Sequence, residues 1–423
     1  MRCGSGFDKL SPLLRDKEFV RLWTIGGLRG AMRWLEILVI GIYTFQVSGS
    51  PFVVAMLLVF RMLPMVLFGT IIGAIVENMD RRRILICTCA VMTLSAGIGA
   101  VAAAIDIVSL PLLAALAFIN GLGWATDWPV RRTLVGDVVK PRRLGNAMSL
   151  ESLTNSATRM IGPLVGGVAF QTVGLGGAYT IAAFIYGLTV VFAIKLTPPQ
   201  RSSPTKSSEK LFARLKTGLV YVGRNQVITG VFVITVIINL FGFAYVAILP
   251  AWASENFQAG PVFVGLLASA EGGGAVLGSV ILALRANHKT YFQRLFLIGS
   301  MTFLGCLLIA SKFTLYGVAV VILFFAGIGI ACFTVMQSTI ILNETAPEYR
   351  SRIMGVLAAC IGAGPLGVIN IGMIAELTSA GTAIAISGAS GLALIAFVTW
   401  RLKKFGVRQN CHQKNAGDSN NSF

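Results

Sequence analysis

The sequence carries little charge for its length. Of its 423 residues, 12% are charged and 55% are hydrophobic, and only two are histidines. Water-soluble domains carry about 25% charged residues, and a chain of this size cannot build a core that hides so much apolar side chain from water. The composition excludes a soluble enzyme, a disordered protein, a coiled coil and a disulfide-rich scaffold. It leaves a polytopic membrane protein.

Sequence motifs for nucleotide hydrolysis, metal binding and nucleophilic catalysis are also missing. No glycine-rich loop ends in Lys-Ser or Lys-Thr, so no built-in ATPase is expected. The seven cysteines have neither paired nor zinc-ligand spacing. The polar segments are too short to hold a catalytic triad. We therefore expect no cofactor, no metal ion and no enzyme activity, with energy drawn from an ion gradient or from the substrate gradient itself.

Long apolar stretches dominate the rest of the sequence. A helix needs roughly 20 mostly apolar residues to cross a bilayer. Twelve stretches qualify, and they are continuous and rich in Ala, Gly and Leu, which indicates helices rather than the alternating pattern of a β-barrel. The prediction is an all-α membrane protein with twelve transmembrane helices. The stretches cover about 22–46, 53–76, 84–104, 110–134, 147–170, 177–195, 226–251, 261–284, 293–311, 315–341, 352–377 and 382–400.

Basic residues set the expected orientation. With the N-terminus placed in the cytoplasm, all but five of the 35 Lys and Arg residues fall in seven cytoplasmic segments. This distribution predicts that both termini are cytoplasmic. It also explains the net charge of +18 without nucleic acid, because no compact basic domain exists.

Residues 196–225 form a polar segment that divides the chain into two parts of six spans each. Residues 209–223 within it form either an amphipathic helix on the membrane surface or a solvated loop. The two parts echo each other, since Gly162-Pro163 in the fifth span resembles Gly364-Pro365 in the eleventh. Six plus six spans in the same orientation indicate a parallel repeat. The expected domains are a cytoplasmic tail 1–21, an N-terminal bundle 22–195, a cytoplasmic central loop 196–225, a C-terminal bundle 226–400 and a cytoplasmic tail 401–423.

The segment from Gly73 to Arg83 (GAIVENMDRRR), together with twelve spans and a polar central loop, resembles the major facilitator superfamily. The family usually has Asp, Arg and Gly at positions 77, 78 and 80. The resemblance implies two six-helix pseudo-repeats that rock about a central site, with a conformational latch at Gly73, Glu77 and Arg81. It also implies a monomer.

A narrower resemblance, to the branch that holds the enterobactin exporter and macrolide efflux pumps, covers residues about 18–375. It implies export of a small molecule through the inner (plasma) membrane by a multi-pass protein in contact with lipid. The matching pieces are Phe19 to Trp23, Arg61 to Pro64, Arg81 to Arg83, Pro129 to Arg132, Gly145 to Leu150 and Gly162 to Gly167.

Charged residues within the spans are the best site candidates, because an ionised group in hydrocarbon costs several kcal/mol and therefore faces protein or a water-filled cavity. Arg29, Arg33 and Glu36 share one helix face. This stripe either binds an anion through its guanidinium groups or neutralises itself through an Arg33–Glu36 salt bridge. Arg61 is interpreted as structural.

Three further ionisable residues lie deep in spans. Arg159, near mid-membrane, either binds substrate or pairs with Asp127 or Glu36. Asp127 is either a proton carrier or the partner of Arg131. Glu271 has no basic neighbour on its own span, and it either exchanges protons or pairs with an Arg of the other half. Four buried Arg against three buried acids leave one positive charge without a partner.

The prediction from sequence is proton-coupled export of a small organic molecule that is anionic or amphipathic and siderophore-like. A multidrug or macrolide exporter is one alternative; an uptake permease, or a non-transporting sensor or lipid-handling protein on the same fold, is the other. Three groups of residues carry the prediction. The substrate-binding group is Arg29, Arg33, Arg159, Asn239, Gln337 and Asn370, the proton-coupling group is Glu271, Glu36 and Asp127, and Trp34, Trp124 and Trp128 either line the pathway or pack.

Overall fold

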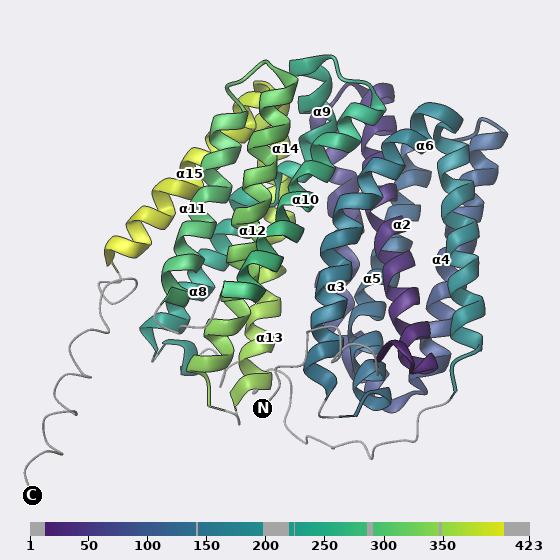
Figure 1. Cartoon of the computed structure of the whole chain (residues 1–423). Coiled ribbons are helices and arrows are strands. Elements are labelled where there is room, and N and C mark those ends of the chain that lie inside the picture. Colours follow the sequence, from purple (N-terminus) through teal and green to yellow (C-terminus); the bar gives the residue numbers. More distant parts are fainter. Residues whose placement is uncertain are drawn as a thin grey trace, which may run out of the picture.

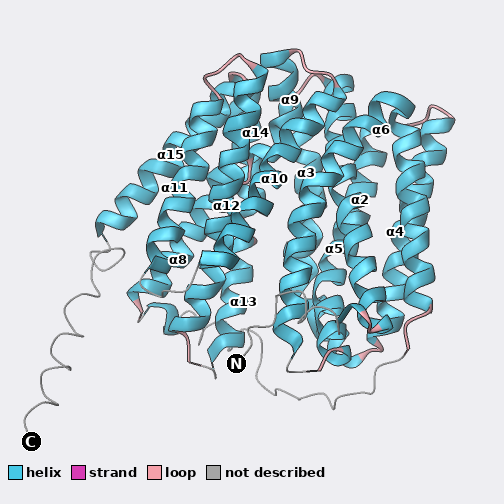
Figure 2. Ribbon diagram, in the orientation of Figure 1, coloured by secondary structure: helices cyan, strands magenta, loops and turns pink. Residues whose placement is uncertain are grey.

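The computed structural model describes residues 13–140, 143–197, 220–223, 225–285, 291–346 and 349–401. All regular structure within these ranges is helical (Figure 2), which confirms the all-α prediction. The elements are α2 (Lys17–Ser48), α3 (Pro51–Asn78), α4 (Arg81–Ala104), α5 (Leu110–Val138), α6 (Leu144–Ile194), α8 (Gln226–Ile237), the π-helix η2 (Ile238–Gly242), α9 (Tyr245–Phe257), α10 (Pro261–Arg285), α11 (Phe292–Ala310), α12 (Tyr316–Glu344), α13 (Arg350–Ile361), α14 (Gly364–Leu377) and α15 (Ala380–Arg401).

Ten helical stretches in the described part are long and apolar enough to cross a membrane. One of them, α6, has 51 residues and would extend about 75 Å if straight, over twice the thickness of a bilayer core. It is broken at Gly174, whose φ of 65° only glycine adopts readily. Helix α2, with 32 residues, is also long enough to cross a membrane, but it carries the charged stripe of Arg29, Arg33 and Glu36 and is not among these ten. The count of twelve crossings and the cytoplasmic placement of the termini stay predictions.

Local signals explain where the helices begin and end. The side chain of Asp16 caps α2, and Asp80 caps α4 in the same way, because each accepts hydrogen bonds from the first free N–H groups. Gly49, with a φ of 64°, ends α2, and Pro51 opens α3 directly afterwards. These signals produce sharp reversals between neighbouring helices.

One helix departs from regular α geometry. In η2 the N–H of Phe243 bonds the carbonyl of Ile238, five residues earlier, at 2.9 Å. This π segment joins α8 to α9, so the seventh predicted span is one continuous but irregular helix. Short π segments in an α-helix carry one additional residue and often accompany functional sites.

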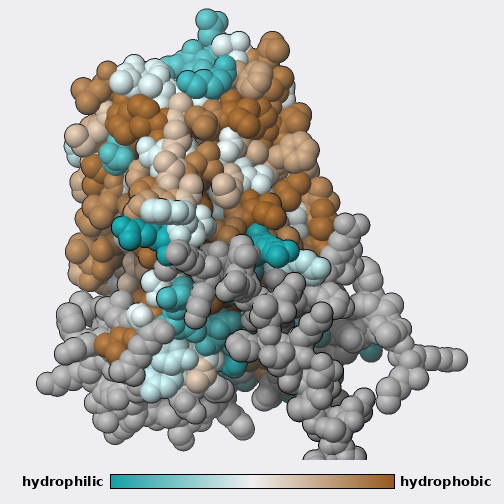
Figure 3. Space-filling model, turned by 90° about the vertical axis from the view of Figure 1, so that its left-hand side faces the viewer, coloured by the Kyte–Doolittle hydropathy of each residue, from teal (hydrophilic) through white to brown (hydrophobic). Residues whose placement is uncertain are grey.

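The helices form two bundles (Figure 1). Helices α2 to α6 pack on one another, and α8 to α15 form the second group. Many large apolar side chains point outward, among them Leu94, Phe184, Leu315 and Trp400. Figure 3 shows such side chains covering one face of the molecule between hydrophilic clusters, as lipid contact requires. The domain boundaries stay predictions. Residues 1–12 and 402–423 and most of the loop 196–225 lie outside the described residues.

The bundles meet where α6 contacts α10 and where α3 contacts α14. Glycine permits the first contact. A Cβ on Gly167 would lie 2.4 Å from the carbonyl oxygen of Pro261, and one on Gly265 would lie 2.6 Å from that of Pro163. No larger residue fits between backbones this close.

Two helix caps reach across between the bundles at the same end of the molecule. Glu376 in α14 accepts hydrogen bonds from the hydroxyl of Ser50 (2.7 Å), directly before α3, and from the N–H of Phe52 (3.3 Å) in its first turn. Gln171 in α6 accepts one from the N–H of Val262 (3.3 Å), in the first turn of α10. The bundles are therefore closed at this end, which is opposite to the end where α2 begins (Figure 1).

Candidate functional site

A cavity lies between the bundles, with about 720 Å³ of empty space that includes the solvent at its mouth. We call it the interbundle cavity. Its wall is mostly apolar. The residues that line it include Trp34, Arg61, Arg159, Tyr245 and Glu271.

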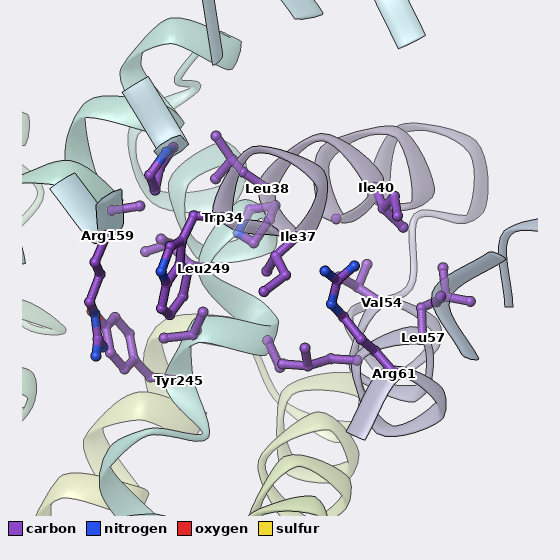
Figure 4. A pocket seen from close by; sticks show the side chains of 18 of the residues that line it. Trp34, Ile37, Leu38, Ile40, Val54, Leu57, Arg61, Arg159, Tyr245 and Leu249 are labelled. Atoms are coloured by element: carbon purple, nitrogen blue, oxygen red, sulfur yellow. The ribbon is translucent and has the colours of Figure 1, made fainter. Parts of the chain in front are cut away.

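The central feature of this cavity is an ion pair between Arg159 of α6 and Glu271 of α10, which belong to opposite bundles. Tyr245 of α9 donates its hydroxyl hydrogen to the same carboxylate. The Arg159 guanidinium lies over the rings of Trp34 (5.0 Å) and Phe243 (5.4 Å), one from each bundle. Figure 4 shows Arg159 and Tyr245 together at one end of the cavity and Arg61 at the other. The structure thus shows Glu271 paired with an Arg of the other half, while proton exchange at Glu271 stays a prediction. The suggested pairing of Arg159 with Asp127 or Glu36 is wrong, because those carboxylates pair with Arg29 and Arg61.

Glycines bring Glu271 into this position. A Cβ on Gly272 would lie 2.6 Å from the backbone nitrogen of Met160, next to Arg159. On the opposite side, a Cβ on Gly327 of α12 would lie 1.9 Å from the carbonyl of Glu271 itself. Helix α10 is thus packed tightly between α6 and α12, and only 2% of Glu271 is exposed.

A second buried ion pair joins Arg61 of α3 to Glu36 of α2 at 3.4 Å. Tyr186 of α6 donates a further hydrogen bond to the same Glu36 oxygen at 3.2 Å. Both ion-pair partners are at most 5% exposed. The suggested Arg33–Glu36 salt bridge is therefore wrong, because Glu36 faces α3 rather than its own helix neighbour.

A third buried pair joins Arg29 of α2 to Asp127 of α5 at 2.6 Å. Arg29 also contacts the carbonyl of Gly123 (3.3 Å), while Asp127 has a second partner in Arg131 (3.4 Å). The charge of Arg29 is thus satisfied within the N-terminal bundle. Its predicted contact with substrate stays a prediction.

These three pairs leave Arg33, which is half-buried, as the arginine within the predicted spans without a carboxylate partner among the described residues. Its guanidinium lies over the rings of Trp34 (5.0 Å) and Trp124 (5.2 Å) and bonds the amide oxygen of Asn155 at 3.4 Å. The unmatched positive charge counted in the sequence is that of Arg33.

The predicted amide residues do not line the interbundle cavity. Asn239 donates to the carbonyl of Thr235 (2.9 Å), and Gln337 donates to the hydroxyl of the same Thr235 (2.6 Å), inside the C-terminal bundle. Asn370 is exposed and lies outside the lining as well. The sequence could not distinguish these positions from lining ones, since all three are single amides in apolar runs.

The predicted latch is only partly visible. Gly73 and Glu77, like Trp128, lie at helix positions for which the structure describes the backbone but not the side-chain surroundings. Arg81 forms an ion pair with Asp137 at 2.5 Å, which ties α4 to α5 within the N-terminal bundle.

Two site residues escaped the sequence reasoning. Tyr245 is 1% exposed and holds Glu271, and Asn120 is fully buried in α5 with neither amide atom hydrogen-bonded in the described part of the chain. Each is a single polar residue within an apolar run, and this isolated position was the one sequence feature that could have marked it as a site residue.

A family model described as transmembrane secretion effector matches residues 8–418. The chain belongs to this family. The resemblance to the major facilitator superfamily is thereby confirmed, and the family is one of membrane transporters.

Two curated relatives and one solved structure illustrate the similarity. Macrolide efflux protein A of Streptococcus pyogenes is 21% identical over 79% of this chain and 83% of its own length. The staphyloferrin A transporter of Staphylococcus aureus is 21% identical over 81% of this chain and 86% of its own length. A mutant of the nucleoside transporter NupG shares the fold, with a TM-score of 0.72, 12% identity, and coverage of 91% of this chain and 100% of that chain.

Proposed function

We propose that this protein is a monomeric secondary transporter of the inner (plasma) membrane that exports a small anionic or amphipathic organic molecule by proton antiport. The observation that carries the proposal is the Arg159–Glu271 pair, which links the two bundles inside a cavity lined by both. When the bundles rock, this link has to break and form again, so it joins the binding event to the conformational change.

The proposed cycle begins in the state seen here, closed at the Glu376 end and paired at Arg159–Glu271. A substrate carboxylate takes the place of Glu271 on Arg159, because both are planar acceptors for a guanidinium fork. Tyr245 still donates a hydrogen bond to the Glu271 carboxylate at that moment. The link between the bundles is now broken, and they rock to face outward.

In the outward-facing state the substrate leaves and Glu271 takes a proton from the outside. The bundles then close again, and Arg159 returns to Glu271. In the proposed cycle Arg159 takes the place of the proton on the Glu271 carboxylate as the ion pair forms again, and the proton leaves on the inside. One anion moves out and one proton moves in per cycle.

The test is flux in proteoliposomes with an imposed pH gradient, using staphyloferrin A as the carboxylate probe and pyranine to follow protons. Glu271→Gln is expected to abolish proton movement while keeping or raising probe affinity, because Arg159 is freed. Arg159→Ala is expected to lose affinity for the probe. Glu344→Gln removes an exposed carboxylate at the end of α12 and serves as the control. Proton-driven flux that survives Glu271→Gln would contradict the proposal.

One observation favours a second candidate, a macrolide or multidrug exporter. The interbundle cavity is mostly apolar and contains one carboxylate, Glu271, that a cationic amphipathic drug could bind directly. The same variants separate the two candidates. With a macrolide as the probe, this candidate predicts that Glu271→Gln loses affinity for the drug and that Arg159→Ala keeps it.

A further inference from the structure

A second cavity lies inside the N-terminal bundle, with about 610 Å³ of empty space that includes the solvent at its mouth. We call it the N-bundle cavity. All the residues that line it come from α2, α4, α5, α6 and, through Arg61, α3. It is therefore distinct from the interbundle cavity, which both bundles line, although Arg61 borders each of them.

The charges around the N-bundle cavity do not balance. Arg29 pairs with Asp127, and Arg131 pairs with Glu151, so these four cancel. Arg61 is matched by Glu36. Arg33 is left over, and its buried Nε has no hydrogen-bond acceptor among the described residues. An unmatched guanidinium surrounded by helices attracts an anion.

Asn120 is the second unsatisfied group on this wall. It is fully buried, and both its amide nitrogen and its amide oxygen lack hydrogen-bond partners in the described ranges. Leaving a buried polar group unpaired costs about 1–3 kcal/mol. A donor and an acceptor held ready at that cost fit a ligand that carries a hydroxyl or an amide.

Aromatic faces complete the wall. The indole of Trp23 is fixed by its hydrogen bond to the hydroxyl of Thr154 at 2.7 Å, and Trp124 lies beneath the Arg33 guanidinium. Tryptophan presents a large flat apolar surface at a small entropic cost. The wall thus combines one guanidinium without a carboxylate partner, one amide without a hydrogen-bond partner among the described residues, and two indoles.

We infer that the N-bundle cavity is a second binding subsite, specific for an organic carboxylate that carries a neighbouring hydrogen-bonding group on a flat apolar body. Arg33 holds the carboxylate, Asn120 holds the hydroxyl or amide, and Trp23 and Trp124 cover the ring. The inference rests on the proposed export of an anionic molecule. This subsite is a second position at which that molecule binds, separate from its position at Arg159.

The experiment is equilibrium binding by isothermal titration calorimetry to the full chain in lipid nanodiscs. The probe is salicylate, and salicylamide is its neutral counterpart. Arg33→Ala is expected to weaken salicylate binding at least tenfold, because a charge-assisted bidentate contact is lost, and to leave salicylamide unchanged. Asn120→Leu keeps the volume and is expected to weaken both probes about threefold to tenfold. Arg83→Ala, which removes a largely exposed charge, is the control.

Arg33→Lys provides a variant that keeps the charge, so a folding defect in Arg33→Ala does not leave the question open. It is expected to retain part of the preference for salicylate over salicylamide. Equal affinity of the native protein for the two probes would overturn the inference, as would binding lost in Arg159→Ala but kept in Arg33→Ala. Because binding is measured without a gradient, failure here leaves the Glu271 flux test unaffected, and the reverse also holds.

Discussion

The carboxylate of Glu376 accepts a hydrogen bond from the hydroxyl of Ser50 at 2.7 Å, although the two residues belong to opposite bundles. Gln171 plays the matching part for α10, so each bundle caps a helix of the other. Both capped helices begin with proline, Pro51 and Pro261. The two caps differ in charge, since only Glu376 adds the attraction of a carboxylate for a helix N-terminus.

Replacing Glu376 by alanine should loosen the closed end. A lost helix cap costs about 1 kcal/mol, which corresponds to a roughly fivefold shift toward the open arrangement. Spin labels at Val47→Cys and Leu377→Cys, two exposed positions near the cap, report the separation by double electron–electron resonance in a background without native cysteine. Glu344→Ala is the control, and an unchanged distance distribution in Glu376→Ala would rule out a gating role for the cap.

Gly167→Ala tests the close approach of α6 and α10. The added methyl carbon would lie 2.4 Å from the carbonyl of Pro261, so the bundles have to separate at this end. The same spin labels should show longer distances. Gly305→Ala is the matched control, because nothing lies within 4 Å of its new Cβ, and a helix gains up to about 1 kcal/mol from Gly to Ala. Identical behaviour of the two variants would contradict this prediction.

We expect the Arg29–Asp127 pair to stabilise the folded protein and to have no effect on its affinity for salicylate. Arg29→Met strands a buried carboxylate, which typically costs 3–5 kcal/mol, although Arg131 compensates part of that here. We expect a lower Tm for the detergent-solubilised protein and recovery in Arg29→Met combined with Asp127→Leu. Calorimetry with salicylate should show unchanged affinity in the double variant. A large loss of affinity there would instead support the substrate contact predicted for Arg29.

The sequence was sufficient for the helical class and for the charge balance of the buried groups. It could not assign the partners, because each of the three pairs joins residues on different helices. Arg33 and Glu36 illustrate the difficulty. Their spacing permits a salt bridge along one helix, but Arg61 enters from α3 and takes the carboxylate.

The amides show a second limit. A polar residue in an apolar span can satisfy itself locally, as Asn239 does by bonding the carbonyl four residues earlier. Spacing along the sequence cannot reveal whether a cavity or a backbone group lies opposite. Asn120 and Asn239 therefore look alike in the sequence, although one faces a cavity without a partner and the other is satisfied within its own helix.

The π segment at Ile238–Gly242 fixes the rotational setting of α9 by a single residue. Each residue of an α-helix turns the chain by about 100°. Deleting Leu240 would restore ordinary winding and swing the phenol of Tyr245 away from Glu271. We expect that deletion to uncouple proton movement from flux while the flanking helices α8 and α9 remain intact, as circular dichroism can verify. The carboxylate at the centre of the protein thus depends for its hydroxyl donor on one irregular turn.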